Sequence, residues 1–298
     1  MGLFVEGWHV AYRNKKCGSI LNDTETNFCA IPNPWHGWCA DPFVFEYKEQ
    51  VYIFAELFDY IKDYAGIGYC VLDKKTNKFS KWKVVIEEQF HMSYPFLFER
   101  DGNVYMLPET SGNNSLIFYR AEEFPEVWVK EKILLDDIQI VDTTLDDVKE
   151  QEILGQTYKL KEDSKWELWT FKMSDYKICF SESGPMSNDD ATARPGGRFF
   201  NYEDKKFRVS QDCEKSYGYA LNFMEVAEFS KDVLTEKLVK YISPDDIHVD
   251  KHIKITGIHT YNATENFEVI DVKSVDYNLL YFFFRICRKI KRVIKNGK

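Results

Sequence analysis

Ionisable side chains stand at matching places in this sequence, beside short apolar segments that have the length of strands. Asp41 and Asp142 each begin such a segment, and Glu56 and Glu109 each end one. Paired carboxyl groups are the usual means of acid–base chemistry at the anomeric carbon of a sugar. Arginines such as Arg194 recognise phosphate or carboxylate groups through bidentate hydrogen bonds. Together these residue types indicate a pocket that binds a sugar or a phosphosugar.

The segments that carry these residues repeat along the chain. Residues 41–46 (DPFVFE) match residues 94–99 (YPFLFE), and residues 51–56 (VYIFAE) match residues 104–109 (VYMLPE), both at an offset of 53 residues (94 − 41 and 109 − 56). Each unit reads as an apolar strand, a polar turn and a second strand that ends in glutamate. The turn at Asp101-Gly102 has the composition of a two-residue hairpin loop, so each unit is predicted to be a β-hairpin.

Three weaker copies of the unit follow. They open at residues 141–145, 194–200 and 257–262, and their second strands are predicted at residues 166–171, 207–212 and 267–271. Repeats of roughly 40–50 residues, each a small β-meander, are typical of propeller blades. We therefore predict an all-β fold, with a five-bladed β-propeller over residues 1–275 and a basic amphipathic helix over residues 276–298.

The innermost strand of each blade lines the central channel, so the residues that begin these strands converge at one end of it. We predict that Asp41 is the base and that Glu109 or Asp142 is a partner acid or stabiliser. An anion clamp is predicted from Arg194, Arg198 and Arg208. The other predicted substrate-binding residues are Glu56, His91, Tyr94, Gln211, Asp212, Tyr217 and His259. A structural alternative stays open, because repeated acidic residues in propellers also tie blades together through hydrogen bonds to backbone amides.

Composition and charge exclude several classes of protein. The formal net charge is −9, which argues against a nucleic-acid partner because phosphate neutralisation needs clustered Lys and Arg. The seven cysteines are odd in number and form no CxxC pair, which predicts neither a zinc site nor a disulfide framework and suits a reducing compartment. We expect no cofactor, although a divalent cation held by channel carboxylates is left open.

The end of the sequence has a different character from the rest. Residues 279–298 begin with an apolar, aromatic run and continue with seven Lys or Arg and no acidic residue. Their apolar residues recur at helical spacing, which predicts a helix that lies on an anionic membrane surface through Leu279 to Lys298. The alternative is a helix that binds a partner or forms a dimer. Because residues 1–15 lack the apolar core of a signal peptide, we expect a cytoplasmic protein, peripheral on the inner face of the membrane.

Several short motifs occur in an order that resembles a known family. They are ADPF at 40–43, HMSYPF at 91–96, PE at 108–109, VDTT at 141–144, ARPGG at 193–197, QD at 211–212, YG at 217–218 and GIHT at 257–260. The ordered set resembles the N-terminal domain of plant glucosamine inositolphosphorylceramide transferase and its free-standing bacterial relatives. The resemblance implies a propeller similar to that of family 43 glycoside hydrolases, and a setting in glycolipid or surface-polysaccharide synthesis.

The resemblance also bears on the reaction. Asp41 matches the blade-one aspartate that acts as base or nucleophile in the hydrolases, and Glu109 is preferred as the acid over Glu182 of the sequence ESGP. We predict a glycosyl or related group transferase that uses a sugar nucleotide or a lipid-linked sugar phosphate. Two alternatives stay open: a glycoside hydrolase with the same carboxylates, and a non-catalytic glycan-binding module for a partner transferase.

Overall fold

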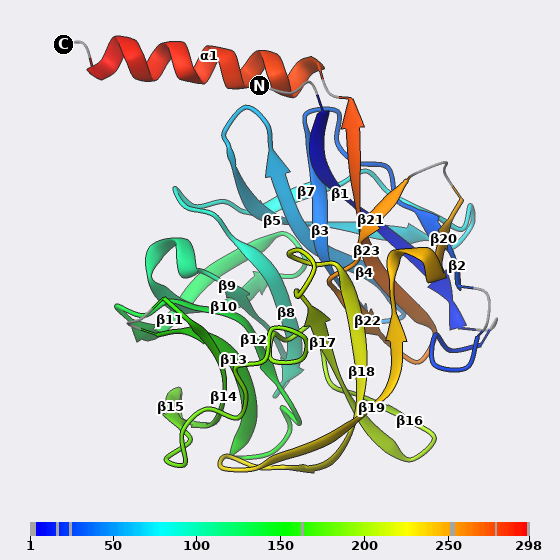
Figure 1. Ribbon diagram of the computed structural model, residues 1–298, viewed down its shortest axis with the longest axis vertical. Helices are drawn as coiled ribbons and strands as arrows, with labels where there is room; N and C mark the ends of the chain where they lie inside the picture. The colour runs from blue at the N-terminus through cyan, green and yellow to red at the C-terminus, as the bar shows by residue number, and fades with distance from the viewer. Residues whose placement is uncertain are drawn as a thin grey trace.

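The computed structural model describes residues 4–15, 18–23, 26–161, 164–250, 254–277 and 279–296. Within these residues, five β-sheets form the blades of a propeller, and one long helix lies against it (Figure 1). The prediction of an all-β, five-bladed β-propeller with a C-terminal helix is confirmed.

In each of the first four blades, the strands follow the chain order from the axis outward. Blade one contains β3 (Gly37–Tyr47), β4 (Gln50–Asp59) and β5 (Tyr64–Asp73), with β6 (Lys78–Phe79) and β7 (Lys83–Ile86) both pairing with β5. Blade two contains β8 (Ser93–Arg100), β9 (Asn103–Glu109), β10 (Ser115–Glu123) and β11 (Val127–Asp136). Blade three contains β12 (Ile140–Leu145), β13 (Ile153–Leu160), β14 (Trp166–Ser174) and β15 (Lys177–Phe180). Blade four contains β16 (Phe200–Tyr202), β17 (Lys205–Asp212), β18 (Ala220–Phe229) and β19 (Leu234–Ile242).

Blade five joins the two ends of the propeller. Its strands are β21 (Ile255–Gly257), β22 (Tyr261–Ala263), β23 (Phe267–Tyr277), β1 (Phe4–Asn14), β2 (Thr26–Ala30) and β20 (Ile247–Val249). The first strand of the chain, β1, pairs antiparallel with β23 along its whole length, from Phe4 opposite Tyr277 to Asn14 opposite Phe267. This pairing closes the ring of blades with backbone hydrogen bonds between the first and the last strand of the chain.

The prediction for the second strand of blade three was wrong. Residues 166–171 lie in β14, the third strand, and the second strand is β13, which pairs with both β12 and β14. The sequence of β13, ILGQTYKL, mixes apolar and polar residues and contains a glycine, so its pattern is weaker than that of β14. The second strands predicted in blades four and five lie within β17 and β23.

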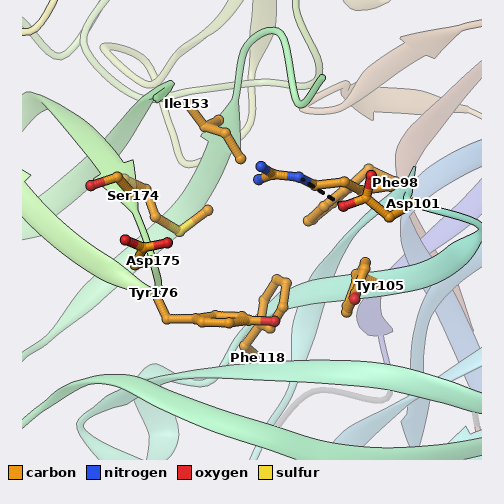
Figure 2. Close-up of a pocket in the computed structure, with 10 residues that line it drawn as sticks. Phe98, Asp101, Tyr105, Phe118, Ile153, Ser174, Asp175 and Tyr176 are labelled. Carbon is orange, nitrogen blue, oxygen red and sulfur yellow. Dashed lines mark ion pairs between the residues drawn. The ribbon is translucent and has the colours of Figure 1, made fainter. Parts of the chain in front are cut away.

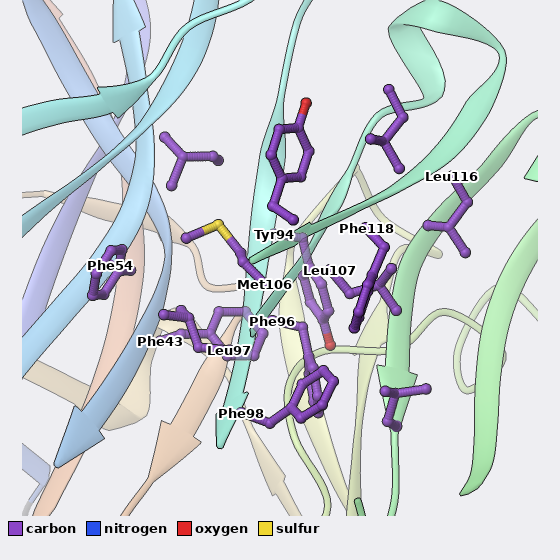
Figure 3. Close-up of a cluster of buried hydrophobic side chains, with 14 of the residues drawn as sticks. Phe43, Phe54, Tyr94, Phe96, Leu97, Phe98, Met106, Leu107, Leu116 and Phe118 are labelled. Carbon is purple, nitrogen blue, oxygen red and sulfur yellow. The ribbon is translucent and has the colours of Figure 1, made fainter. Parts of the chain in front are cut away.

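Aromatic side chains fill the space between the first three blades (Figure 3). Phe43, Phe54 and Phe96 are fully buried, and Phe98 and Phe118 are almost so. Burying each such side chain stabilises the fold by roughly 2–3 kcal/mol. Since Phe43 and Phe96 follow Asp41 and Tyr94 by two residues in β3 and β8, the same strands anchor the core and carry the predicted site.

The helix α1 (Leu279–Asn296) follows β23 directly and lies across one end of the propeller (Figure 1). No helix among the described residues is long and apolar enough to cross a membrane. The helix contacts the loop between β4 and β5, where the ring of Tyr281 lies 4.7 Å from that of Tyr60. That loop stands at the end of blade one where β3 begins, so the helix lies on the same side as the predicted site.

Candidate functional site

Three innermost strands share one backbone distortion where they reach the site. Asp41, Tyr94 and Asp142 have φ angles of 50°, 45° and 53°. At each of them the pairing with the second strand changes register, which defines a β-bulge. A bulge takes the residue out of the ladder and redirects its side chain. Left-handed backbone costs a non-glycine residue about 1–3 kcal/mol, so these conformations persist only because their surroundings hold them.

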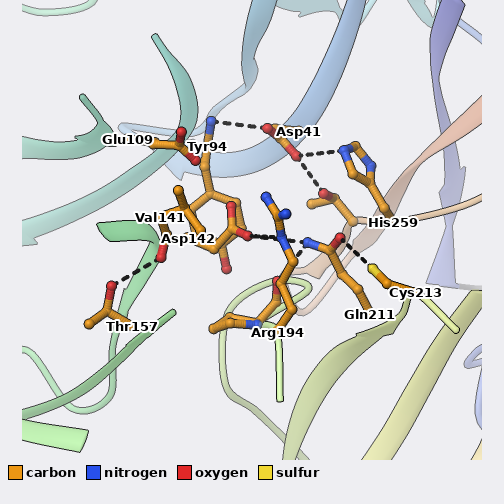
Figure 4. A network of polar contacts seen from close by, with 12 residues as sticks. Asp41, Tyr94, Glu109, Val141, Asp142, Thr157, Arg194, Gln211, Cys213 and His259 are labelled. Atoms are coloured by element: carbon orange, nitrogen blue, oxygen red, sulfur yellow. Dashed lines mark hydrogen bonds and ion pairs between the residues drawn. The ribbon is translucent and has the colours of Figure 1, made fainter. Parts of the chain in front are cut away.

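Asp41 connects three blades through its two carboxyl oxygens (Figure 4). Oδ2 accepts the backbone N–H of Tyr94 at 3.2 Å, and Oδ1 accepts the hydroxyl of Thr260 at 2.7 Å. The ring Nε2 of His259 lies 3.5 Å from Oδ1. The carboxyl group is 6% exposed and thus lies at the base of the cluster rather than at its surface.

Asp271 of β23, like Asp41, joins neighbouring blades through hydrogen bonds to its carboxylate. Its oxygens accept the backbone N–H groups of Asp41 (2.8 Å), His259 (3.1 Å) and Thr260 (2.9 Å). Its Oδ2 also lies 2.7 Å from the ring Nδ1 of His259. This fully buried carboxylate therefore ties blade five to blade one, as the structural alternative predicted for repeated acidic residues.

Asp41 and His259 form a buried pair whose protonation is shifted. Burial raises the pKa of Asp41 to about 8, although the His259 ring opposes this rise. Burial would lower the pKa of His259, but the carboxylates of Asp271 and Asp41 outweigh it and raise the pKa to about 8. The pair therefore titrates close to neutral pH, far from where an exposed aspartate would.

Glu109 is the least constrained carboxyl of the cluster. It ends β9 opposite Ser93, the same place that Glu56 holds opposite Ala40 in blade one. Its Oε1 accepts a hydrogen bond from the hydroxyl of Ser111, at 2.6 Å. Burial, followed by the charge of Asp142, raises the pKa of Glu109 to about 7. Glu109 can therefore either donate or accept a proton at neutral pH.

Glu56 and His91 form a second acid–imidazole pair beside Glu109. Nε2 of His91 lies 3.1 Å from Oε1 of Glu56, and the His91 side chain is 41% exposed. Burial would lower the pKa of His91, but Glu56 and then Glu109 raise it to about 9. The partly exposed ring thus pairs with a buried carboxylate through Nε2, while its Nδ1 lies 3.3 Å from the backbone N–H of Ala65.

Arg194 is the arginine that the structure brings to the cluster. Its Nε donates to Oδ2 of Asp142 at 2.6 Å, and Nε2 of Gln211 lies 3.4 Å from the same oxygen (Figure 4). The guanidinium carbon lies 4.8 Å from the ring centroid of Tyr217, a half-exposed side chain. Among the described residues, the terminal nitrogens of Arg194 have no hydrogen-bond partner, which leaves two donor groups for a ligand.

Three predicted site residues lie outside this cluster. The guanidinium of Arg208 makes two hydrogen bonds to the Glu236 carboxylate, at 2.7 and 2.6 Å, and is 1% exposed. Arg198 donates to the carbonyl of Leu97 and lies over the ring of Phe96. Asp212 accepts the N–H of Glu214 in a turn. The predicted clamp of three arginines thus contributes only Arg194 to the cluster.

Two residues of the site escaped the sequence analysis. The ring of Trp8 in β1 stacks on that of His259 at 3.9 Å, and strand β1 had no repeat to identify it. Tyr158 lies opposite Val141, the same position that Glu56 and Glu109 hold in their blades, and its ring is 6.0 Å from the Arg194 guanidinium carbon. A correct assignment of β13 would have identified Tyr158 by this register.

A cation site is available only at the cost of existing bonds. Asp41, His259 and Asp271 each offer one ligand atom, and these atoms lie within 4.8 Å of one another. Oxygen ligands suit hard cations. However, both oxygens of Asp271 already accept backbone N–H groups, so a divalent cation here would have to displace the bonds that join blades five and one.

A pocket of about 200 Å³ opens at the other end of blades two and three (Figure 2). It is lined by the β8–β9 and β14–β15 turns, including Arg100, Asp101 and Tyr176, and by no predicted site residue. Glu182, the alternative acid, also lies apart from the cluster, since it is 89% exposed and pairs with Lys231.

The fold and the cluster define a five-bladed β-propeller with a carboxyl-rich site at one end of its axis. Residues 16–278 match the family described as glucosamine inositolphosphorylceramide transferase 1, N-terminal, and the chain belongs to this family. The family predicted from the ordered motifs is therefore confirmed.

Comparisons with individual proteins agree with this family. The chain is 28% identical over 247 residues to glucosamine inositolphosphorylceramide transferase 1 of Arabidopsis thaliana, which covers 78% of this chain and 30% of the plant protein. The protein of the same name from Oryza sativa subsp. japonica is 26% identical over 251 residues, with 75% and 31% covered. The chain thus spans about a third of the length of these relatives. The α-L-arabinofuranosidase of Podospora anserina shares the fold, with a TM-score of 0.58, 8% identity and 83% and 94% covered.

Proposed function

We propose that the cluster around Glu109 binds a sugar and transfers a glycosyl or related group in the synthesis of a glycolipid or cell-surface polysaccharide. The observation that carries this proposal is the geometry of the cluster: Glu109, whose only side-chain hydrogen bond among the described residues comes from Ser111, lies with the Arg194–Asp142 and His91–Glu56 pairs at one end of the axis. Burial raises the pKa of Glu109 to about 7. A carboxyl group of this kind protonates the leaving oxygen, or takes a proton from an acceptor hydroxyl, in reactions at an anomeric carbon. The names of the plant relatives, glucosamine inositolphosphorylceramide transferases, support a glycolipid as acceptor.

Asp41, predicted as the base, has a different role in this proposal. Its oxygens already accept hydrogen bonds from two neighbouring blades, and it is nearly buried. We therefore assign the proton transfer to Glu109 and give Asp41 the role of positioning β8 and His259.

The donor is a sugar nucleotide or a lipid-linked sugar phosphate, used on the cytoplasmic face of the membrane. Arg194 supplies two free donor groups for its phosphate. The nearby carboxyl groups of Glu56, Glu109 and Asp142 would repel a highly charged phosphate group placed among them. Attraction by Arg194 and repulsion by the carboxyl groups together favour a donor whose sugar binds in the cluster and whose phosphate lies beside Arg194 and Tyr217.

A second candidate is a non-catalytic glycan-binding module. Asp41, Asp142 and Asp271 all use oxygens in bonds between blades, which leaves Glu109 as the main free acid. The chain also covers only 30% of the Arabidopsis relative, so an activity of that protein can reside in its remaining part.

The experiment compares Glu109→Gln with the matched control Glu182→Gln, which changes an exposed glutamate outside the cluster. The full chain is incubated with sugar nucleotides or lipid-linked sugar phosphates and a glycolipid extract, and new glycosylated products are measured by mass spectrometry. We expect Glu109→Gln to lower the rate by about 100-fold or more, since general acid–base groups contribute factors of 10²–10⁴. Glu182→Gln should leave the rate unchanged. Ligand binding without turnover, equal in all three proteins, would instead support the binding module.

A further inference from the structure

Helix α1 has a stripe of apolar side chains that faces away from the propeller. Leu279 is 60% exposed, Phe283 59% and Ile286 36%. These residues follow one another at intervals of four and three, so they lie on one side of the helix. A helix on the surface of a soluble domain normally packs such a stripe against the core. The stripe of α1 is therefore placed for contact with something other than the propeller.

The other side of the helix is fixed to blade one by polar and aromatic contacts. The guanidinium of Arg288 lies 2.7 Å from Oδ1 of Asp63 and also donates to the backbone carbonyl of Tyr60. The ring of Tyr281 packs on that of Tyr60, and the Arg288 guanidinium carbon lies 5.6 Å from the Tyr281 centroid. These contacts set the rotation of the helix, so the exposure of the apolar stripe follows from a defined docking.

Two loop residues of blade one add to the exposed apolar area near this docking point. Ile61, next to Tyr60, is 48% exposed, and Trp35 is 73% exposed. The N–H of Tyr60 donates to the carbonyl of His36 at 2.8 Å, which holds the Trp35 loop beside the loop that contacts α1. Trp side chains are enriched at the headgroup level of bilayers. We call Trp35, Ile61, Leu279, Phe283 and Ile286 the outer apolar surface.

Charge supports one occupant for this surface. Residues 279–298 carry seven Lys or Arg and no acidic residue, whereas the whole chain has a net charge of −9. An anionic lipid surface attracts the helix and repels the acidic body. Both effects favour the same orientation, with α1 toward the lipid and the blades away from it. Binding to a neutral apolar partner would not explain why the helix is basic while the rest of the chain is acidic.

We propose that the outer apolar surface docks the protein on an anionic lipid bilayer, with α1 in the plane of the headgroups. Glu56 lies in β4 four residues before Tyr60, so the docking point stands at the same end of blade one as the site. The bilayer therefore lies next to the Glu109 cluster, within reach of the headgroup of a glycolipid. Only this choice of acceptor rests on the proposed function; the docking itself does not depend on it.

The test is co-sedimentation of the purified full chain with phosphatidylcholine vesicles, with and without phosphatidylglycerol. We expect binding to the vesicles that contain phosphatidylglycerol, and its loss at high salt. Phe283→Glu should weaken binding by about ten-fold or more, because it puts a charge into the apolar contact. The matched control is Leu238→Glu in β19, where the leucine is 54% exposed on blade four; it should bind as the unchanged protein does.

Three results would overturn the proposal. They are no binding to either kind of vesicle, equal binding by Phe283→Glu and Leu238→Glu, and a dimer in sedimentation equilibrium that Phe283→Glu dissociates. The last result would mean that the stripe pairs with a second copy of the chain. Thermal unfolding of both variants is measured to check that each remains folded. Because the assay contains no sugar, its outcome is separate from the failure or success of the turnover experiment.

Discussion

Replacing Glu109 by Gln should stabilise the protein above neutral pH and leave its stability unchanged in acid. The ordinary pKa of a glutamate is 4.5, and burial beside Asp142 raises that of Glu109 to about 7. Between these two values the unfolded chain has lost the proton and the folded protein retains it. Stability therefore falls as the pH rises through this range, and the full loss is present above about pH 7.

The size of the effect follows from the same two values. An interval of about 2.5 pH units, at about 1.4 kcal/mol for each, corresponds to roughly 3 kcal/mol. Glu109 is only partly shielded from water, so this figure is an upper bound. Glutamine has nearly the same shape, and its carbonyl oxygen can still accept the hydroxyl of Ser111. The substitution thus removes the charge with little other change.

Urea unfolding of both proteins at pH 4.5, 6 and 8 measures the difference. We expect Glu109→Gln to match the unchanged protein at about pH 4.5 and to exceed its free energy of unfolding by about 1–3 kcal/mol at pH 8. Other titrating pairs, such as Asp41 and His259, are present in both proteins and largely cancel. A difference that is the same at all three pH values would refute the assignment of a raised pKa to Glu109.

Two further substitutions test the frame of the site. Asp271→Asn should lower the free energy of unfolding by about 3–5 kcal/mol in urea, because the new amide group would face the N–H of Asp41 and the Nδ1 of His259. A loss below about 1 kcal/mol would contradict the role of Asp271 as the tie between blades. Gly218→Ala should destabilise the protein more than Gly102→Ala. Both glycines have positive φ, but a Cβ at Gly218 would lie 2.8 Å from Trp8 and 2.9 Å from His259, whereas nothing lies within 4 Å at Gly102. Equal midpoints of thermal unfolding for the two variants would show that this close packing is unimportant.

The blades that the sequence predicted well are those whose signals are local. The hairpin turn at Asp101-Gly102 has both residues at positive φ, with Arg100 paired to Asn103, as the two-residue loop predicts. The repeat of Asp41 and Tyr94 at a spacing of 53 also placed both residues at one end of the axis. The bulges themselves were not predicted, because φ at a single residue depends on its neighbours in the folded structure.

The features that were missed depend on contacts between distant parts of the chain. Arg208 and Arg194 look alike in sequence. However, Arg208 donates to Glu236 in β19 of its own blade, whereas Arg194 donates to Asp142 of blade three. In the same way, the helix pattern of α1 predicted an apolar side but not its direction. That direction is set by Arg288 and Asp63, which are far apart in the chain.

The central claim is that a sugar ligand binds at the Glu109 cluster, with its anionic group on Arg194. It is tested most directly by thermal unfolding of the protein and of Arg194→Ala with a panel of sugar nucleotides, sugar phosphates and free sugars, since a ligand that binds the folded state raises its melting temperature. The account predicts stabilisation by a phosphate-bearing sugar that disappears in Arg194→Ala while that variant remains folded. Stabilisation that is the same in both proteins, or that only neutral sugars produce, would contradict it.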